Sequence, residues 1–191
     1  AIVFIGLLPL STALFAVLGG GDNPRPLFWL FSVVGGLIVA SYAYGQASQA
    51  TLLGDVLMLG AIIVCGLGYA EGASLSRRLG GWQVICWALV FSLPVMLPLS
   101  FMTRPETWGN IGVMAWGGLA YVTLFSMLIG FFFWYRGLAQ GGAAAVGQLQ
   151  LLQPFFGLML AASIAGEPVS MGMVLTAGVV VLCVAGAKRF A

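Results

Sequence analysis

Polar side chains are rare inside the apolar stretches of this sequence, and the densest group lies at residues 148–153. Gln148, Gln150 and Gln153 alternate there with leucines. Gln150 and Gln153 are three residues apart and share a helix face, whereas Gln148 points elsewhere. Pro154 has no N–H, so it is expected to leave the carbonyl of Gln150 free. We therefore predict that this group, Gln148, Gln150, Gln153 and Pro154, lines a solute-binding cavity. The alternative is that the glutamine amides join neighbouring helices through hydrogen bonds worth about 1 kcal/mol each.

Glu71 is the acidic residue best separated from the breaks between apolar stretches. An acid at mid-helix in a membrane costs at least ~2.5 kcal/mol, so such a residue is normally functional or paired. Its functional roles would be proton coupling or charge pairing with a substrate amine. The alternative is an acid at headgroup level that pairs with Arg77 or Arg78 nearly two turns later.

Two further residues are weaker candidates for the same cavity. Tyr121 offers a ring that stacks on planar or cationic solutes, and Ser126 follows it by a little over one turn. The sequence contains no histidine, no G-x-S-x-G elbow and no G-x-x-x-x-G-K-[ST] loop. We accordingly expect no cofactor, no metal, no ATP binding and no catalysis.

Composition places all these residues in a membrane protein. Of the 191 residues, 61% are hydrophobic and 6% are charged, against about 25% charged residues in soluble domains. The mean hydropathy is +1.09. The charged residues are too few to cover the surface of a water-soluble protein of this size. Most of the surface is therefore expected to contact lipid. The net charge of +2 is too small to indicate nucleic-acid binding.

Seven apolar stretches are long enough for helices that cross the ~30 Å hydrocarbon core. They run approximately over 1–19, 26–45, 53–75, 82–102, 109–135, 143–165 and 169–187. The fold class predicted is therefore an all-α polytopic bundle. Six basic residues fall on one side of it and Arg104 alone on the other, which predicts a multi-pass protein of the cell membrane with a cytoplasmic C-terminus.

An internal repeat is visible in the spacing of two prolines. Pro9 and Pro154 each follow a leucine-rich run, and each is followed by apolar residues and a turn with glycine, an acid and proline. The repeat has a period of five spans, and an odd number of spans per period inverts the second copy in the membrane. Inverted repeats with broken helices are a signature of secondary transporters. A chance match between two proline-ended helices is the alternative.

Several short motifs resemble the drug/metabolite transporters of the EamA type. They are Gly54-Asp55-Val56-Leu57, Ser76-Arg77-Arg78-Leu79, Phe133-Trp134-Tyr135-Arg136-Gly137-Leu138, Leu151-Leu152-Gln153-Pro154 and Gly166-Glu167-Pro168. The resemblance implies a ten-helix transporter of two inverted five-helix repeats. It makes residues 1–45 the last two helices of the first repeat and 53–191 the second repeat, with the first three helices absent here. It also implies a small organic solute, an amino acid or related metabolite, that is exported through a bacterial inner membrane.

The chain is thus expected to act by alternating access, with a small-molecule substrate and membrane lipid as its partners. If these 191 residues were the whole protein, transport would require a homodimer. A seven-helix receptor and an intramembrane enzyme are the two alternatives. The inverted repeat argues against the first, and the missing catalytic motifs argue against the second.

Overall fold

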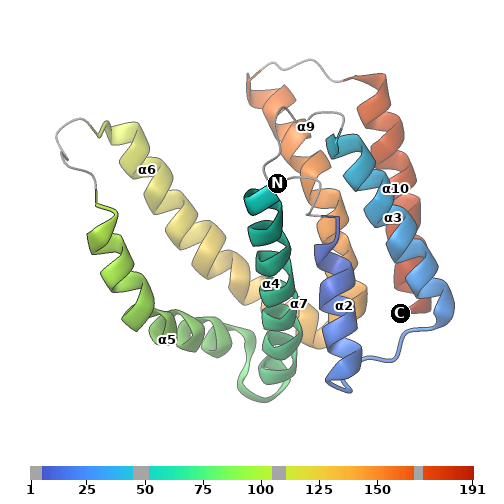
Figure 1. Ribbon diagram of the computed structural model, residues 1–191, viewed down its shortest axis with the longest axis horizontal. Helices are drawn as coiled ribbons and strands as arrows, with labels where there is room; N and C mark the ends of the chain where they lie inside the picture. The colour runs from blue at the N-terminus through green and yellow to red at the C-terminus, as the bar shows by residue number, and fades with distance from the viewer. Residues whose placement is uncertain (1–5, 45–51, 105–110, 166–169) are drawn as a thin grey trace. The chain divides into compact units, whose positions relative to one another are not determined.

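The structure is a computed structural model that describes residues 6–44, 52–104, 111–165 and 170–191 (Figure 1). Within these ranges every regular element is helical, and the predicted all-α class is confirmed. The elements are α2 (Leu8–Leu18), α3 (Pro26–Tyr44), α4 (Leu52–Leu79), α5 (Gly81–Met102), α6 (Val113–Tyr121), η1 (Val122–Ile129), α7 (Gly130–Gly141), α8 (Ala143–Gly147), η2 (Gln148–Leu152), α9 (Gln153–Ala165) and α10 (Met171–Phe190). Element η1 is a π-helix and η2 a 3₁₀-helix, each continuous with its neighbours.

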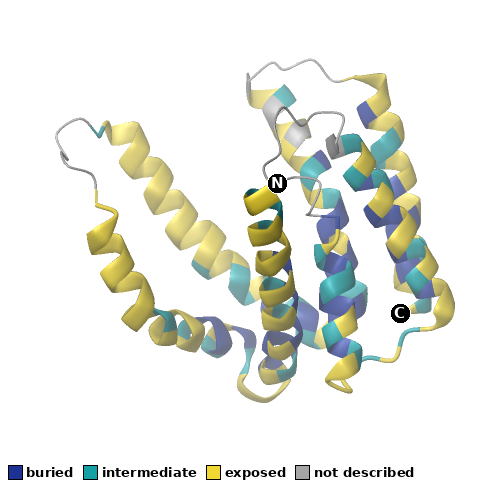
Figure 2. Ribbon diagram, viewed as in Figure 1, coloured by how far each residue is buried: buried dark blue, intermediate teal, exposed yellow. Residues whose placement is uncertain are grey.

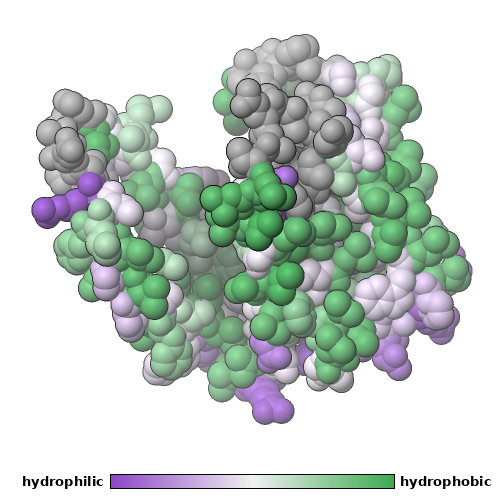
Figure 3. All heavy atoms as spheres, viewed as in Figure 1, coloured by the Kyte–Doolittle hydropathy of each residue, from purple (hydrophilic) through white to green (hydrophobic). Residues whose placement is uncertain are grey.

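Among the described residues, five continuous helical stretches are long and apolar enough to cross a membrane. They are Leu52–Leu79, Gly81–Met102, Val113–Gly141, Ala143–Ile164 and Met171–Phe190. Helices α2 and α3 are apolar but shorter in their described parts; the predicted span 1–19 begins outside the described residues. Large apolar side chains such as Leu37 and Val64 point outward, and green hydrophobic residues dominate the visible face in Figure 3. This surface suits lipid, and it agrees with a multi-pass membrane protein.

Glycines in the left-handed region end three of the helices. Gly20 (φ 68°) follows α2, and the N–H groups of Gly20 and Gly21 donate to the carbonyls of Val17 and Ala16, both at 3.0 Å. This pair of hydrogen bonds is a Schellman motif. The motif requires a positive φ at Gly20, which glycine adopts without steric strain because it has no Cβ. Gly80 (φ 98°) and Gly142 (φ 83°) are single-residue breaks between α4 and α5 and between α7 and α8. Each break therefore turns the chain with no intervening loop.

The chain divides into two compact units, and each is described by itself. The first unit comprises Ala1–Glu71 and Gly141–Ala191. In it, α3 and α10 lie side by side along their lengths (Figure 1) and run antiparallel. The backbone N–H of Arg25 donates to the carbonyl of Phe190 at 2.8 Å at one end. Farther along, a Cβ at Gly35 would lie 3.2 Å from Cys183 Cβ, so the two backbones approach closely.

Helix α2 packs in the same antiparallel manner against α8. A Cβ at Gly147 would meet Thr12 Cγ2 at 3.4 Å, and Ala13 packs in one cluster with Ala144. Small residues on both sides allow this approach, as is usual between membrane helices, where close packing replaces the hydrophobic driving force. The first unit therefore contains two antiparallel helix pairs, α3 with α10 and α2 with α8.

The buried side chains of the first unit, dark blue in Figure 2, form two separate apolar clusters. The smaller cluster consists of Ala13, Phe28, Ala144 and Ala187. The larger cluster consists of Val39, Leu151, Phe155, Met173, Val180 and Val184. Along α3 and the helix of residues 143–165, the buried polar residues Ser32 and Gln148 lie between members of the two clusters.

The second unit comprises Gly72–Gln140, which includes the end of α4, all of α5 and the long helix from α6 to α7. Its packing also depends on glycine. A Cβ at Gly72 would collide with the ring of Tyr135, and one at Gly81 would lie 2.8 Å from the backbone nitrogen of Arg136. Glycine at these two positions lets the ends of α4 and α5 contact α7.

Candidate functional site

The glutamine-rich segment lies where a membrane-length helix changes its winding. Residues 143–165 form one continuous helix, but Gln148–Leu152 is wound as a 3₁₀-helix between α8 and α9. Pro154 follows two residues after this segment and cannot donate a backbone hydrogen bond. A 3₁₀ stretch inside a longer helix often marks a functional hinge or local strain.

The expectation that Pro154 frees the carbonyl of Gln150 is wrong. The backbone N–H of Gln153 donates to that carbonyl. In an α-helix this carbonyl would need the N–H of residue 154, which proline lacks. In the tighter 3₁₀-helix each carbonyl pairs with the N–H three residues later, so Gln153 supplies the donor. Any solute contact from this segment must therefore come from the side chains.

Gln148 is the most deeply placed of the three glutamines. Its side chain is 0% exposed, and neither Oε1 nor Nε2 has a hydrogen-bond partner. Leaving a buried polar group unpaired costs about 1–3 kcal/mol, and such groups are uncommon in folded proteins. The amide offers one acceptor and two donors to anything that reaches it.

Ser32 lies at the same level as Gln148 on the neighbouring helix α3. Two pairs of residues set this alignment. Phe28 and Ala144, four residues before Ser32 and Gln148, belong to one apolar cluster. Gly35 and Leu151 follow them by three residues, and a Cβ on Gly35 would lie 3.0 Å from Leu151 Cδ1. Ser32 is 1% exposed, and its Oγ also lacks a partner. We call Ser32 and Gln148 the buried polar layer, because they separate the two apolar clusters.

The remaining residues of the segment differ in exposure. Gln150 is buried, with an unpartnered Oε1. Gln153 is exposed and Pro154 is intermediate. Thr12 on α2 is 0% exposed, and its hydroxyl donates to the carbonyl of Leu8 at 3.0 Å. The segment therefore buries two of its three glutamines, and neither the Gln148 amide nor Gln150 Oε1 joins helices through a hydrogen bond.

The other predicted site residues are exposed within their own units. Glu71 points outward from α4 in the first unit. Tyr121 is 63% exposed and stacks on Phe125 at a ring-centroid distance of 5.5 Å in the second unit. Ser126 is exposed on the π-helix η1. π-Helical segments are frequent at functional sites, but here the segment lies apart in sequence and unit from the glutamines.

Sequence reasoning did not single out Ser32 or Thr12. Each is a lone small hydroxyl residue in an apolar helix, where hydroxyls commonly bond to their own backbone. Thr12 does so, whereas Ser32 does not. Ser32 is recognised as a candidate site residue from its alignment with Gln148 on the neighbouring helix. Only the packing of α3 against η2 reveals this alignment.

These features describe an all-α membrane protein with neutral hydrogen-bonding groups buried among its helices, as membrane transporters require. Residues 52–187 match the EamA-like transporter family, and the chain belongs to that family. It is 66% identical over 191 residues to the uncharacterized transporter YdeK of Bacillus subtilis (strain 168), covering all of this chain and 67% of that protein.

Two more distant relatives are also transporters by name. The uncharacterized transporter YyaM of the same organism is 22% identical over 186 residues, which covers 94% of this chain and 61% of that protein. The uncharacterized transporter sll0355 of Synechocystis sp. (strain ATCC 27184 / PCC 6803 / Kazusa) is 26% identical over 117 residues, 61% of this chain and 36% of that protein. No solved structure matches the chain.

Proposed function

We propose that this chain forms part of a secondary transporter that carries a small polar organic solute across the cell membrane by alternating access. Its cargo is an amino acid or related metabolite, and the direction is export. Membership of the EamA-like transporter family supports transport over a receptor or an enzyme. No nucleic acid, cofactor or metal takes part in this proposal.

The observation that best supports solute recognition in this span is the unpaired amide of Gln148. The amide is fully buried, and both of its polar atoms lack a hydrogen-bond partner. A conformation that admits solute to the buried polar layer would satisfy donors and acceptors whose desolvation cost is already incurred. Gln150 supplies a further unpaired oxygen on the same span.

The antiparallel helix pairs support the alternating-access part of the proposal. Helices related by an axis in the membrane plane run in opposite directions, as α3 does against α10 and α2 against α8. We therefore propose that residues 1–45 end the first inverted repeat and that residues 53–191 form the second. The basic residues at the ends of α4 and α10 support a cytoplasmic C-terminus.

Accumulation of labelled solutes in everted membrane vesicles tests the proposal. The vesicles would carry the full-length gene, and amino acids and related metabolites would be offered with and without an imposed pH gradient. We expect accumulation of at least one compound above empty vesicles. Gln148→Leu should reduce it at least tenfold, because Leu keeps the volume and removes the hydrogen bonds.

Gln153→Leu is the matched control, because Gln153 is on the same span but exposed. It should retain most of the accumulation. No accumulation of any compound would contradict the transport proposal. Equal activity in the two variants would instead remove Gln148 from solute recognition.

A further inference from the structure

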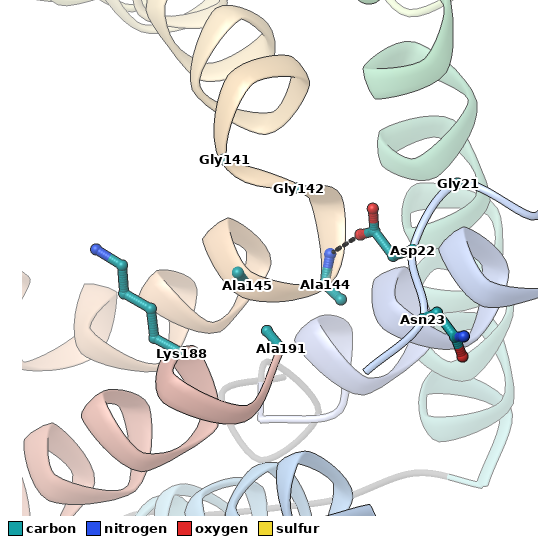
Figure 4. A pocket seen from close by; sticks show the side chains of 9 residues that line it. All are labelled: Gly21, Asp22, Asn23, Gly141, Gly142, Ala144, Ala145, Lys188 and Ala191. Atoms are coloured by element: carbon teal, nitrogen blue, oxygen red, sulfur yellow. Dashed lines mark hydrogen bonds between the residues drawn. The ribbon is translucent and has the colours of Figure 1, made fainter. Parts of the chain in front are cut away.

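A pocket of about 410 Å³ lies at one end of the first unit, and neither Ser32 nor Gln148 belongs to its lining. Its walls come from the turn after α2, the break between α7 and α8, and the end of α10. Figure 4 shows Asp22 and Lys188 on opposite sides, with Ala144 and Ala145 between them. Pockets of roughly 300–1,000 Å³ are typical for small-molecule ligands.

Two hydrogen bonds, one to the Asp22 side chain and one between backbone groups, hold the wall that carries Asp22. One carboxylate oxygen of Asp22 accepts from the N–H of Ala144 at 2.6 Å. Three residues later, the N–H of Arg25 donates to the carbonyl of Phe190 at 2.8 Å. The turn after α2 is thereby joined to both of the other walls, so the pocket keeps its shape without depending on long flexible side chains.

The two charges in the pocket wall are of opposite sign and do not pair with each other. Among the described residues, no carboxylate lies within ion-pair distance of Lys188, which is exposed. Asp22 is half-buried, and its carboxylate accepts a hydrogen bond from a neutral backbone N–H group. Opposed charges across a cavity leave room for a ligand that carries the complementary pair.

We propose that this pocket is a loading site for small zwitterionic solutes, whose cationic group binds Asp22 and whose anionic group binds Lys188. The side chain of Asn23, which also lines the pocket, adds a neutral donor and acceptor. The proposal rests on the proposed transport function and adds a charge requirement for the solute. The basic residues at this end place the site on the side assigned to the cytoplasm, where an exporter collects its cargo.

The test is equilibrium binding to the purified full-length protein in lipid nanodiscs. The probes are alanine, leucine and phenylalanine, each compared with its amide, which is only cationic, and its deaminated acid, which is only anionic. We expect at least one zwitterion to bind more tightly than both of its singly charged analogues. Removing one partly exposed charge contact should weaken binding of that zwitterion by up to about fivefold.

Two variants make the test specific to this pocket. Asp22→Asn keeps an oxygen for Ala144 but removes the negative charge, so the deaminated acid should then bind as well as the zwitterion. Lys188→Gln should do the reverse and bring the amide level with the zwitterion. Because Lys188 is exposed, its variant remains informative even if Asp22→Asn does not fold. Arg189→Gln removes a neighbouring charge outside the pocket lining and should change none of these affinities.

The possible outcomes distinguish failure of the loading-site proposal from failure of the transport proposal. Equal binding of the three forms, or a zwitterion preference that persists in both pocket variants, overturns the loading site. Vesicle accumulation of other solutes in that case would leave the transport proposal standing. Charge-selective binding that depends on Asp22 and Lys188, without accumulation of any compound, would support the site and contradict transport.

Discussion

Asp22 and Ala144 are separated by 122 positions in sequence, yet the Asp22 carboxylate accepts a 2.6 Å hydrogen bond from the Ala144 backbone N–H. Ala144 lies in the first turn of the helix that carries Gln148. The contact therefore fixes the end of the glutamine-bearing span to the turn after α2. A carboxylate also suits this place because the first turn of a helix exposes N–H groups without intrahelical partners.

Replacing Asp22 should destabilise the first unit. Asp22→Ala removes the acceptor for Ala144, and the loss of such a helix-end partner costs about 0.5–2 kcal/mol. Thermal unfolding of the full-length protein in detergent should show a lowered midpoint. Asn23→Ala, one residue further and exposed, should leave the midpoint within error. Equal midpoints for the two variants would mean that the hydrogen bond is not maintained in solution.

Gln148→Leu should raise stability while it lowers solute binding. Leucine removes two polar atoms that are buried without partners, and avoiding that desolvation contributes about 1–3 kcal/mol. The same thermal unfolding assay without solute measures this gain. Ser32→Ala should act in the same direction by a smaller amount, because only one unpaired atom is lost. A lower midpoint for Gln148→Leu would show that the amide finds partners in the native protein.

Gly36→Ala should disrupt the contact between α3 and Gly6, which lies two residues before α2 begins. Its Cβ would lie 2.8 Å from the backbone oxygen of Gly6, a contact that no side-chain rotation relieves. Overpacking of this kind costs about 1–3 kcal/mol. Gly60→Ala is the matched control inside helix α4, where a Cβ meets nothing within 4 Å. It should stabilise by ~0.5–1 kcal/mol through reduced backbone entropy in the unfolded chain.

Glu71→Gln tests the proposed coupling role of the outward-facing acid on α4. If Glu71 carries the coupling proton, the glutamine variant should lose the pH-gradient-dependent part of vesicle accumulation. Exchange of labelled for unlabelled solute should continue, because it needs no net proton movement. Asp55→Asn, at the first turn of the same helix, is the comparison. Gradient-driven accumulation that survives in Glu71→Gln would return this residue to a pairing role with nearby arginines.

The sequence by itself determined the fold class, the positions of the helices and the family. Long apolar stretches broken by glycine and proline specify membrane helices, because lipid offers no partner to an unpaired backbone. The helices from α4 to α10 consequently begin and end within about six residues of the predicted stretches. The resemblance of Leu151-Leu152-Gln153-Pro154 and the other motifs agrees with the family match over residues 52–187.

Only the tertiary structure decided which polar groups are buried and what they contact. A helical period assigned Gln150 and Gln153 to one face, but the packing of the helix against its neighbours buries Gln148 and Gln150 and leaves Gln153 exposed. Ser32 gains its significance from the register of α3 against η2, and Asp22 from a partner 122 positions away. These relationships depend on how separate helices align, and the local pattern of a single helix does not contain that information.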